Sequence, residues 1–229
     1  MVDLRARQSP IRDQGRRGTC VACAATGAHE MLRGGDVSLC IEFAHWGAKQ
    51  RDGLPEASEG TTLAAAAAVL DTLGQPPESR WPYDERRDQW AADYAPPDGA
   101  SDEALHRRTA RGAALVPSVD AVRAALDGGR APLLGVILHG TWYTPGAGGE
   151  IAMPTRGAVA YGGHAVLVVG YATGAGAGGG HFIVRNSWGT GWGDGGDGYL
   201  PFDYVTDYGI AAWALGDPIA VAPPSGEGA

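Results

Sequence analysis

The first half of the chain has apolar residues at helical spacing, interrupted by Gly and Pro residues that end helices. We expect helices over residues 19–33, 38–51, 61–73 and, further along, 118–126. Thr19 stands where its side chain could cap the first of these helices, and Gly34-Gly35 would end it. Residues 95–112 contain Pro96-Pro97-Asp98-Gly99 and are expected to form a loop that connects the two halves of the molecule.

The second half changes character, because short runs of β-branched and aromatic residues lie between glycines. This pattern predicts an antiparallel sheet. We expect strands over residues 133–138, 164–171, 181–185 and 199–202, and a last strand within 208–213. The segment 174–180 is expected to be a hairpin loop, and residues 218–229 a flexible tail or the start of a linker. The chain therefore predicts an α+β fold in which a helical lobe precedes a β lobe.

Composition narrows the class of protein. Of the 229 residues 44% are hydrophobic and 19% are charged, so the chain can form a packed core and is not expected to be disordered. Glycine is enriched, with 37 residues, but no Gly-X-Y period runs through the chain, which excludes a collagen-like protein. The net charge is −8 and the 18 basic residues are scattered, so we expect no nucleic-acid partner. The apolar runs are far shorter than the ~20 residues that cross a bilayer, so we expect no membrane partner.

Cysteine content and the N-terminal sequence bear on the compartment. Three cysteines, Cys20, Cys23 and Cys40, cannot build a disulfide framework in a domain of this size. The first residues contain no apolar signal region. We therefore expect a reducing, cytoplasmic location, or secretion if a leader segment has been removed.

A candidate nucleophile lies at the start of the first predicted helix. Cys20 follows Gly18-Thr19, and a cysteine in the first turn of a helix feels the positive end of the helix dipole, which favours the thiolate. Gly18 would let the backbone pass close to a substrate. Taken alone, a cysteine in an alanine-rich helix is more often inert packing. A catalytic role requires a base elsewhere in the chain.

His164 and Asn186 are the candidate partners of the cysteine. His164 follows Gly162-Gly163 and is expected to open a strand, with backbone space on one side. Asn186 comes directly after the next predicted strand, so a hairpin would bring its amide oxygen beside one imidazole nitrogen. The other nitrogen would then face the thiol, and Trp188 could cover the contact from water.

With these residues in place, the chain resembles a papain-like cysteine peptidase. Four fragments carry the resemblance in the family's order: Gln14-Gly15, Gly18-Thr19-Cys20, Gly163-His164-Ala165 and Asn186-Ser187-Trp188-Gly189-Thr190-Gly191-Trp192-Gly193. The stretch Trp81-Pro82-Tyr83 adds to the resemblance. The resemblance implies two lobes with the active site in the cleft between them. A single catalytic domain is then expected over residues 1–217, with the helical lobe at about 10–112 and the β lobe at about 113–217.

The resemblance implies a role for each matching residue. Cys20 would be the nucleophile, His164 the general base and acid, and Asn186 the group that orients the imidazole. Gln14 would donate its side-chain amide to the oxyanion, together with the backbone N–H of Cys20. The expected substrate-binding residues are Gly18, Gly60, Gly163, Trp188 and Trp213, the last as the floor of the second subsite. The expected partner is a peptide or protein substrate, and no cofactor or metal is implied.

The chain departs from the family at several positions. Arg17 stands where such enzymes have a disulfide-bonded cysteine, and Val21 and Cys23 replace the aromatic pair after the nucleophile. The Cys-Asn-Gly-Gly stretch that usually binds the substrate backbone is absent from the sequence, and Glu59-Gly60-Thr61 is nearest to that place. No inhibitory prosegment precedes Val2, so an inhibitory or regulatory partner is expected to restrain the enzyme unless such a segment was removed.

Three functions stay open on these observations. The first is an endopeptidase that works through a thioacyl-enzyme intermediate. The second is a dedicated maturation enzyme, isopeptidase or peptide ligase that acts on one partner substrate, since either water or an amine can resolve an acyl-enzyme. The third is a non-catalytic binding module, which conflicts with competent residues at all of the expected catalytic positions.

Other patterns are expected to carry no chemistry. Cys20 and Cys23 form C-x-x-C, but a second such pair is missing and no strand precedes it in the thioredoxin manner. Residues 191–196 match G-x-G-x-x-G, but a strand rather than a helix is predicted after them. Asp194 and Asp197 are expected at the tip of a turn rather than around calcium.

Overall fold

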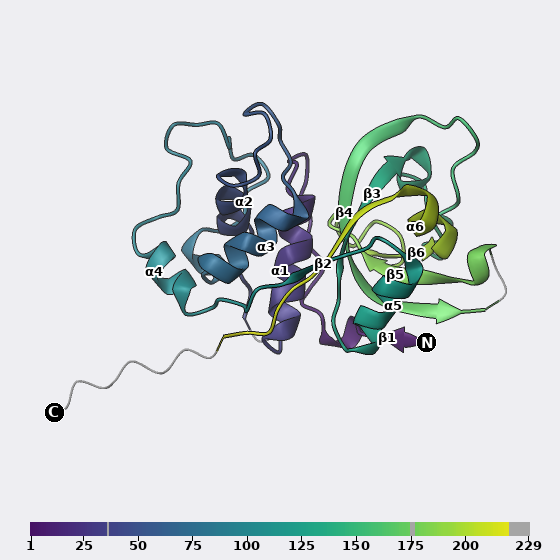
Figure 1. Ribbon diagram of the computed structural model, residues 1–229. Coiled ribbons are helices and arrows are strands. Elements are labelled where there is room, and N and C mark those ends of the chain that lie inside the picture. The colour runs from purple at the N-terminus through teal and green to yellow at the C-terminus, as the bar shows by residue number, and fades with distance from the viewer. Residues whose placement is uncertain (36, 175–176, 220–229) are drawn as a thin grey trace.

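The computed structural model describes residues 1–35, 37–174 and 177–219, and it places helices on one side and strands on the other (Figure 1). The helical side contains α1 (Cys20–Leu32), α2 (Ile41–Lys49), α3 (Leu63–Thr72) and α4 (Ala100–Leu105). The first three confirm the predicted helices. α1 contacts α2, α3 and strand β4 (Ala160–Thr173), so the helix that begins with Cys20 lies at the junction of the two sides.

Side-chain caps explain where two of these helices begin. The Thr62 hydroxyl and the Cys40 sulfur each accept a backbone N–H three residues further on, at 3.1 Å for α3 and 3.3 Å for α2. Thr19 occupies the cap position of α1, but its side chain makes no capping bond and its hydroxyl lies 2.8 Å from the Tyr83 hydroxyl instead. The prediction that Thr19 caps α1 is therefore wrong, because a tertiary contact takes the hydroxyl.

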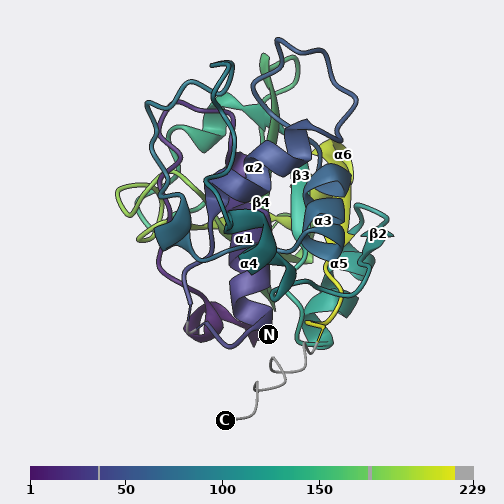
Figure 2. The ribbon, with the colours of Figure 1, turned by 90° about the vertical axis from the view of Figure 1, so that its left-hand side faces the viewer.

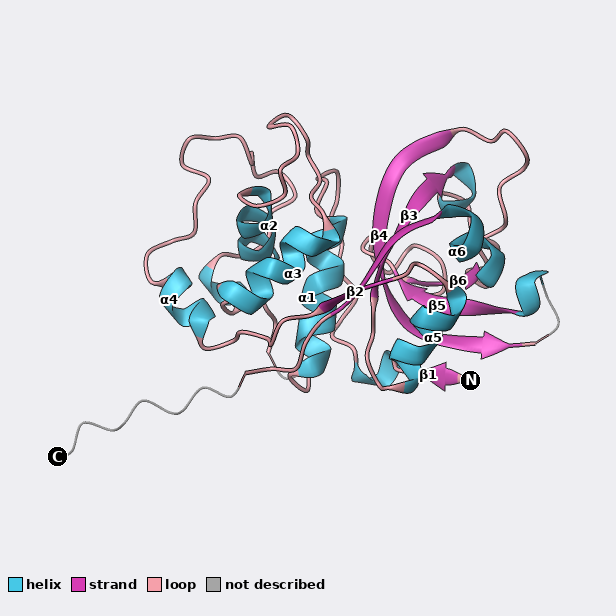
Figure 3. Ribbon diagram, viewed as in Figure 1, coloured by secondary structure: helices cyan, strands magenta, loops and turns pink. Residues whose placement is uncertain are grey.

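The β side is built on one antiparallel sheet. Its strands are β1 (Val2–Asp3), β2 (Ala113–Leu115), β3 (Leu133–His139), β4, β5 (Gly180–Arg185), β6 (Asp197–Pro201) and β7 (Gly209–Ala214). They are ordered β2-β7-β3-β4-β5-β6, and β1 pairs with β4. Two helices, α5 (Val119–Asp127) and α6 (Phe202–Tyr208), lie among the strands (Figure 3). The α+β fold predicted from the sequence is confirmed.

Two helices fall where the sequence predicts something else. α4 lies within residues 95–112, for which a loop is predicted, and it begins after Gly99, whose φ of 77° turns the chain into the helix. α6 begins at Phe202, which the apolar pattern assigns to a strand. Pro201 ends β6 because it has no N–H to donate to a neighbouring strand, and the chain turns into α6 directly after it.

β4 is longer than predicted. It begins at Ala160, four residues before His164, so the expectation that His164 opens the strand is wrong. Gly162 keeps the chain within the sheet at a φ of 111°, a value that residues with a side chain rarely adopt. The two glycines before His164 are therefore part of the strand rather than a turn in front of it.

Two buried apolar clusters lie on the two faces of the sheet. Ala165, Leu167 and Val169 belong to the cluster shared with α1, α2 and α3, whereas Val166 and Val168 belong to the cluster that α5 and α6 cover. This alternation is the two-residue period of a strand that is buried on both faces. Figure 2 shows the helices α1 to α4 in front of the sheet, so the first cluster joins the two sides of the molecule.

The two ends of the described chain lie on opposite sides. At the N-terminus Val2 pairs with Tyr171 of β4, whereas near the C-terminus the Ile219 N–H donates to the Arg108 carbonyl of the helical side at 2.9 Å (Figure 1). Among all the residues that the structure describes, no helix combines the length and the apolar character that a membrane crossing requires. The predicted tail beyond residue 219 and residues 175–176 of the predicted hairpin loop lie outside the described residues.

Candidate active site

Cys20 is the first residue of α1 and is partly exposed at the junction of the two sides. Protein atoms surround most of its sulfur, and this burial raises the pKa of the Cys20 thiol above its ordinary value, although the backbone N–H groups of Ala165, Val21 and Cys20 itself lower it. The helix terminus thus acts in the predicted direction, but desolvation is the larger effect.

His164 and Asn186 meet at the same end of β4 and β5. Leu167 pairs with Arg185 in antiparallel register, so the residues before Leu167 and the residues after Arg185 lie at the same end of the two strands. There His164 Nε2 lies 2.8 Å from Asn186 Oδ1. The same oxygen accepts the Ser187 backbone N–H at 2.8 Å, so the oxygen rather than the nitrogen of the amide faces the imidazole. His164 therefore donates through Nε2, and its Nδ1 keeps a lone pair for another proton.

Aromatic side chains enclose the contact between His164 and Asn186. The Trp188 ring lies 4.9 Å from the His164 ring and the Trp142 ring lies 5.7 Å from it, measured between ring centroids. Tyr143 stacks on Trp188 at 5.4 Å with an angle of 3° between the rings, and it is itself exposed. Trp188 thus lies over the imidazole, where the sequence places it. Trp142 and Tyr143 come from the turn after β3, for which the sequence carries no recognised motif.

The protonation of Cys20 and His164 follows from burial. Burial lowers the pKa of His164 to about 4, and the hydrogen bond to Asn186 offsets part of this effect. Since the pKa of Cys20 is raised, each group taken alone is neutral near pH 7. A proton that passes from the thiol to the imidazole leaves the net charge of the two groups together unchanged. The pair can thereby supply a sulfur nucleophile together with its own base.

Gln14 is buried and held at both ends of its side-chain amide. Its Oε1 accepts the Ser187 hydroxyl at 2.6 Å, and its Nε2 donates to the Arg17 carbonyl at 2.7 Å. The Gln14 backbone N–H also donates to the Ser187 carbonyl at 2.8 Å. These contacts fasten the loop before α1 to the residues that follow β5. Because a primary amide has two N–H donors, one donor of Nε2 remains for a further acceptor.

A pocket of about 240 Å³ lies beside Cys20 and His164, and both line it. Residues from both sides of the molecule form its walls, so it is a cleft between them. Gly60 and Leu63 line it from the helical side, whereas Gly163 and Ile210 line it from the sheet. The predicted binding residues Gly60 and Gly163 therefore both face this cleft.

Two other predicted binding residues lie elsewhere. Trp213 is not among the residues that line the cleft, and Ile210 and Ala211 of the same strand occupy the expected place. The placement of Trp213 in the pocket is therefore wrong, because the predicted register on β7 is displaced by two to three residues. Gly18 packs against the loop at Gly60 instead, where an added Cβ would come within 2.9 Å of the loop backbone.

The other motifs do not line this cleft. Cys23 is a buried free thiol. Asp197 pairs with Arg185 at 2.9 Å, and Asp194 accepts a tyrosine hydroxyl at 2.8 Å. Strand β6 rather than a helix follows the glycine motif at 191–196. Across the described residues, no group of three or more His, Cys, Asp or Glu side chains is placed to hold a metal ion.

Comparison with known proteins finds a family sequence model and solved structures that are similar to this chain. The sequence model of the family described as papain family cysteine protease matches residues 143–215, which include His164 and Asn186. A sequence search of curated proteins finds no match.

Solved structures match over almost the whole chain. The cysteine protease xylellain from Xylella fastidiosa is similar with a TM-score of 0.79 and 25% identity, over 94% of this chain and 85% of that one. Digestive procathepsin L 3 from the Tenebrio molitor larval midgut has a TM-score of 0.70 and 24% identity, over 96% and 69% of the two chains. A cysteine protease from Carica candamarcensis, solved with E-64, has a TM-score of 0.66 and 20% identity, over 94% and 98%. The last two likenesses concern the fold alone.

Proposed function

We propose that this chain, which is a papain-like cysteine peptidase, is an endopeptidase that hydrolyses internal peptide bonds through Cys20 and His164. One observation carries the proposal. His164, held by Asn186 and covered by Trp188, lines the same interlobe cleft as the partly exposed Cys20 at the start of α1. A nucleophile, a base beside it and a third group that orients the base are the parts that thiol acyl transfer requires.

The acylation step uses these groups in turn. Cys20 gives its proton to Nδ1 of His164 while the sulfur attacks the carbonyl carbon of the scissile bond. The oxyanion that forms accepts the backbone N–H of Cys20, which has no partner within the helix, and the remaining N–H of Gln14 Nε2. When the intermediate collapses, the C–N bond breaks, the amine leaves with the proton from His164, and a thioester to Cys20 remains.

Deacylation repeats the sequence with water. His164 takes a proton from a water molecule whose oxygen attacks the thioester carbon, and the same donors hold the second oxyanion. Collapse breaks the C–S bond, and the proton returns to the Cys20 sulfur. Asn186 keeps one tautomer of the imidazole through both halves, because its oxygen accepts only from a protonated Nε2.

The cleft beside the reacting pair favours an apolar substrate side chain. Val21, Leu63 and Ile210 supply hydrocarbon to its walls, and Gly135 and Gly163 leave room between them. Among the described residues, none that lines it carries a carboxylate or an ammonium group, so a charged side chain would lose water there without gaining a partner. Its volume of about 240 Å³ is that of a subsite for one residue rather than of a ligand cavity.

A covalent probe tests the enzyme assignment. A peptidyl epoxide should add to Cys20 and stop peptide cleavage. The variant Cys20→Ala should form no adduct and should cleave no peptide. Cys23→Ala is the matched control on the same helix, because Cys23 is a buried thiol outside the cleft, and it should keep adduct formation and cleavage. An adduct on Cys23, or cleavage that survives Cys20→Ala, would reject the proposed nucleophile.

The alternative fates of the acyl-enzyme need a second measurement. Turnover with an added amine nucleophile separates an endopeptidase, which yields the hydrolysed acid, from a ligase, which yields the amide. Isopeptide and single-substrate maturation activity are separated from general proteolysis by comparing unrelated peptides with the same residue in the cleft. A non-catalytic binding module would bind peptide without forming any covalent adduct.

A further inference from the structure

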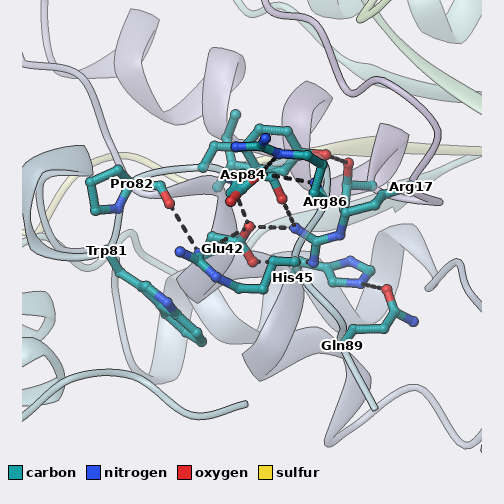
Figure 4. Close-up of polar contacts among 12 residues, drawn as sticks. Arg17, Glu42, His45, Trp81, Pro82, Asp84, Arg86 and Gln89 are labelled. Carbon is teal, nitrogen blue, oxygen red and sulfur yellow. Dashed lines mark hydrogen bonds and ion pairs between the residues drawn. The ribbon is translucent and has the colours of Figure 1, made fainter. Parts of the chain in front are cut away.

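A buried ion-pair network lies next to the active-site loop and takes no part in the chemistry described above (Figure 4). Its centre is Arg17, which is 8% exposed, and Glu42 of α2, which is fully buried. The guanidinium forms a two-pronged contact with the carboxylate, with Nη1 on one oxygen and Nη2 on the other at 3.1 Å. Nη1 also donates to the Asp84 carbonyl at 3.0 Å. A planar fork of this kind fixes direction as well as distance.

Glu42 is satisfied from several directions, as a buried carboxylate must be. The Tyr94 hydroxyl donates to it at 2.9 Å, the Asp84 backbone N–H donates at 3.3 Å, and the Arg87 guanidinium lies 3.2 Å from it. The rings of Tyr83 and Tyr94 lie 5.3 and 5.8 Å from the Arg17 guanidinium carbon. The network therefore ties Arg17 to α2 and to the segment 83–94 at once.

Arg17 is also the residue whose backbone holds Gln14. Its carbonyl oxygen accepts Nε2 of the Gln14 side chain at 2.7 Å, while Ser187 holds the other end of that amide. A movement of the Arg17 backbone would therefore turn the amide that is proposed to donate to the oxyanion. The same loop leads within three residues to Cys20, the first residue of α1.

We infer that Arg17 is a positioning residue: its ion pair with Glu42 anchors the loop before α1 and thereby sets the direction of the Gln14 N–H toward the oxyanion. The inference rests on the proposed function, since it assigns a purpose to Gln14 within that mechanism. Arg17 is not among the residues that line the cleft, so it is placed to act through Gln14, whose side chain donates to its carbonyl. The anchor is ionic and stands at the position where the family resemblance leads one to expect a disulfide-bonded cysteine.

A double-mutant cycle between Arg17 and Gln14 tests this path. Arg17→Lys keeps the charge but loses the fork, and we expect kcat to fall about tenfold while KM changes less than about threefold. Gln14→Ala alone should lower kcat by about 10²–10³, the usual loss for one oxyanion donor. In the Gln14→Ala background, Arg17→Lys should cost less than about twofold, because the group through which it acts is gone.

Glu30→Gln supplies the matched control for a structural effect. Glu30 is a fully buried carboxylate near the other end of α1, and it accepts from Arg12 and from the Leu39 N–H at 2.7 Å. We expect Glu30→Gln and Arg17→Lys to lower the melting temperature by similar amounts, whereas only Arg17→Lys lowers kcat. An Arg17→Lys effect on kcat that persists in full without Gln14, or that Glu30→Gln reproduces, would overturn the inference.

A failure of the proposed function can be told apart from a failure of this inference. Stoichiometric acylation of Cys20 by an activated peptidyl ester, followed as a mass shift, also passes through an oxyanion but needs no peptide-bond turnover. If wild type does not cleave peptides yet is acylated, the endopeptidase proposal fails and the cycle is measured on the acylation rate. If wild type is not acylated, Cys20 is not a nucleophile and both proposals fall.

Discussion

Asn186 Oδ1 accepts the imidazole of His164 at 2.8 Å, and the Ser187 backbone N–H fixes which way that amide faces. The Ser187 backbone N–H therefore determines indirectly that His164, the candidate base, carries its proton on Nε2. An amide turned by 180° would present an N–H to Nε2, and the imidazole proton would then lie on Nδ1.

Removing the orienting amide should slow the reaction without abolishing it. Asn186→Ala removes one hydrogen bond to a group that becomes charged during the reaction, a contact worth about 1.5–3 kcal/mol. We expect kcat/KM to fall about 10- to 150-fold, since each 1.36 kcal/mol corresponds to a factor of ten. Steady-state kinetics on one peptide substrate measures the effect, and Asn186→Gln controls for the loss of the amide group. A loss below about threefold would mean that the ring packing of Trp188 is sufficient to orient His164.

Loss of the proposed oxyanion donor, the Gln14 side chain, should lower kcat more than loss of the Ser187 hydroxyl that holds it. Gln14→Ala should lower kcat by about 10²–10³. Ser187→Ala removes the hydroxyl that Gln14 Oε1 accepts at 2.6 Å but leaves the contact of Nε2 with Arg17, so we expect a loss of about 3- to 10-fold. The ranking is the measurement that matters, because a larger loss for Ser187→Ala than for Gln14→Ala contradicts the assigned roles.

The substrate specificity of the cleft should change when a larger side chain replaces Gly135, which lines it. An added Cβ on Gly135 would lie 3.4 Å from the nearest Ile210 atom, which is ordinary contact, so a larger side chain can extend from there into the cleft. We expect Gly135→Leu to shift the preference at this subsite from large apolar residues to Ala and Gly, in a profile of peptides that vary at one position. Trp213→Phe is the control and should leave the profile unchanged, because Trp213 lies outside the cleft. A changed profile for Trp213→Phe alone would restore the role that the sequence predicts for it.

Ile210 lines the cleft and Trp213 of the same strand does not, which a local sequence pattern cannot predict. Helices α1 to α3 and the central strands follow from local apolar spacing and from Gly and Pro stops, and the sequence predicts them. The residues that face the cleft depend on the register of β7 against β3, and a displacement of one residue turns each side chain to the other face of the sheet. That register is set by packing between elements distant in the sequence, which no local pattern records.

The candidate catalytic positions are easier to find in the sequence than the residues that surround them. Cys20, His164 and Asn186 each stand beside glycines or at the end of an apolar run, so their motifs can be read without the fold. Glu42 gives no such signal, since one acidic residue in a helix normally faces water. Its burial becomes visible only when the loop of Arg17 and the segment 83–94 meet over α2.

Stability should fall as the pH is lowered through the range in which buried histidines acquire protons. Burial lowers the pKa of His29 to about 4 and that of His45 to about 4, from an ordinary value of 6.5. Between these values the unfolded chain binds more protons than the folded one, so the free energy of unfolding decreases as the pH falls from about 6.5 to about 4. Each group contributes about 3 kcal/mol to this loss at its full shift.

The contribution of one histidine can be isolated by substitution. His45→Gln should flatten the decrease in unfolding free energy between pH 7 and pH 4, measured by denaturant titration at several pH values. His106→Gln, at an exposed position on the helical side, should leave the slope as in wild type. An unchanged slope for His45→Gln would show that His45 does not stay neutral in the folded protein.

Activity should have its own acidic limit, set by the Cys20–His164 pair. The neutral pair and the thiolate–imidazolium pair hold the same number of protons, so only the gain of one further proton switches the enzyme off. Because burial lowers the pKa of His164 to about 4, we expect kcat/KM to rise with pH through about 4 and then to level. The Asn186 hydrogen bond raises this pKa, so Asn186→Ala should move the acidic limb to lower pH. Measurements at each pH need a check that the protein is folded, by fluorescence in the same buffer. A limb that stays in place in Asn186→Ala would mean that a group other than His164 sets it.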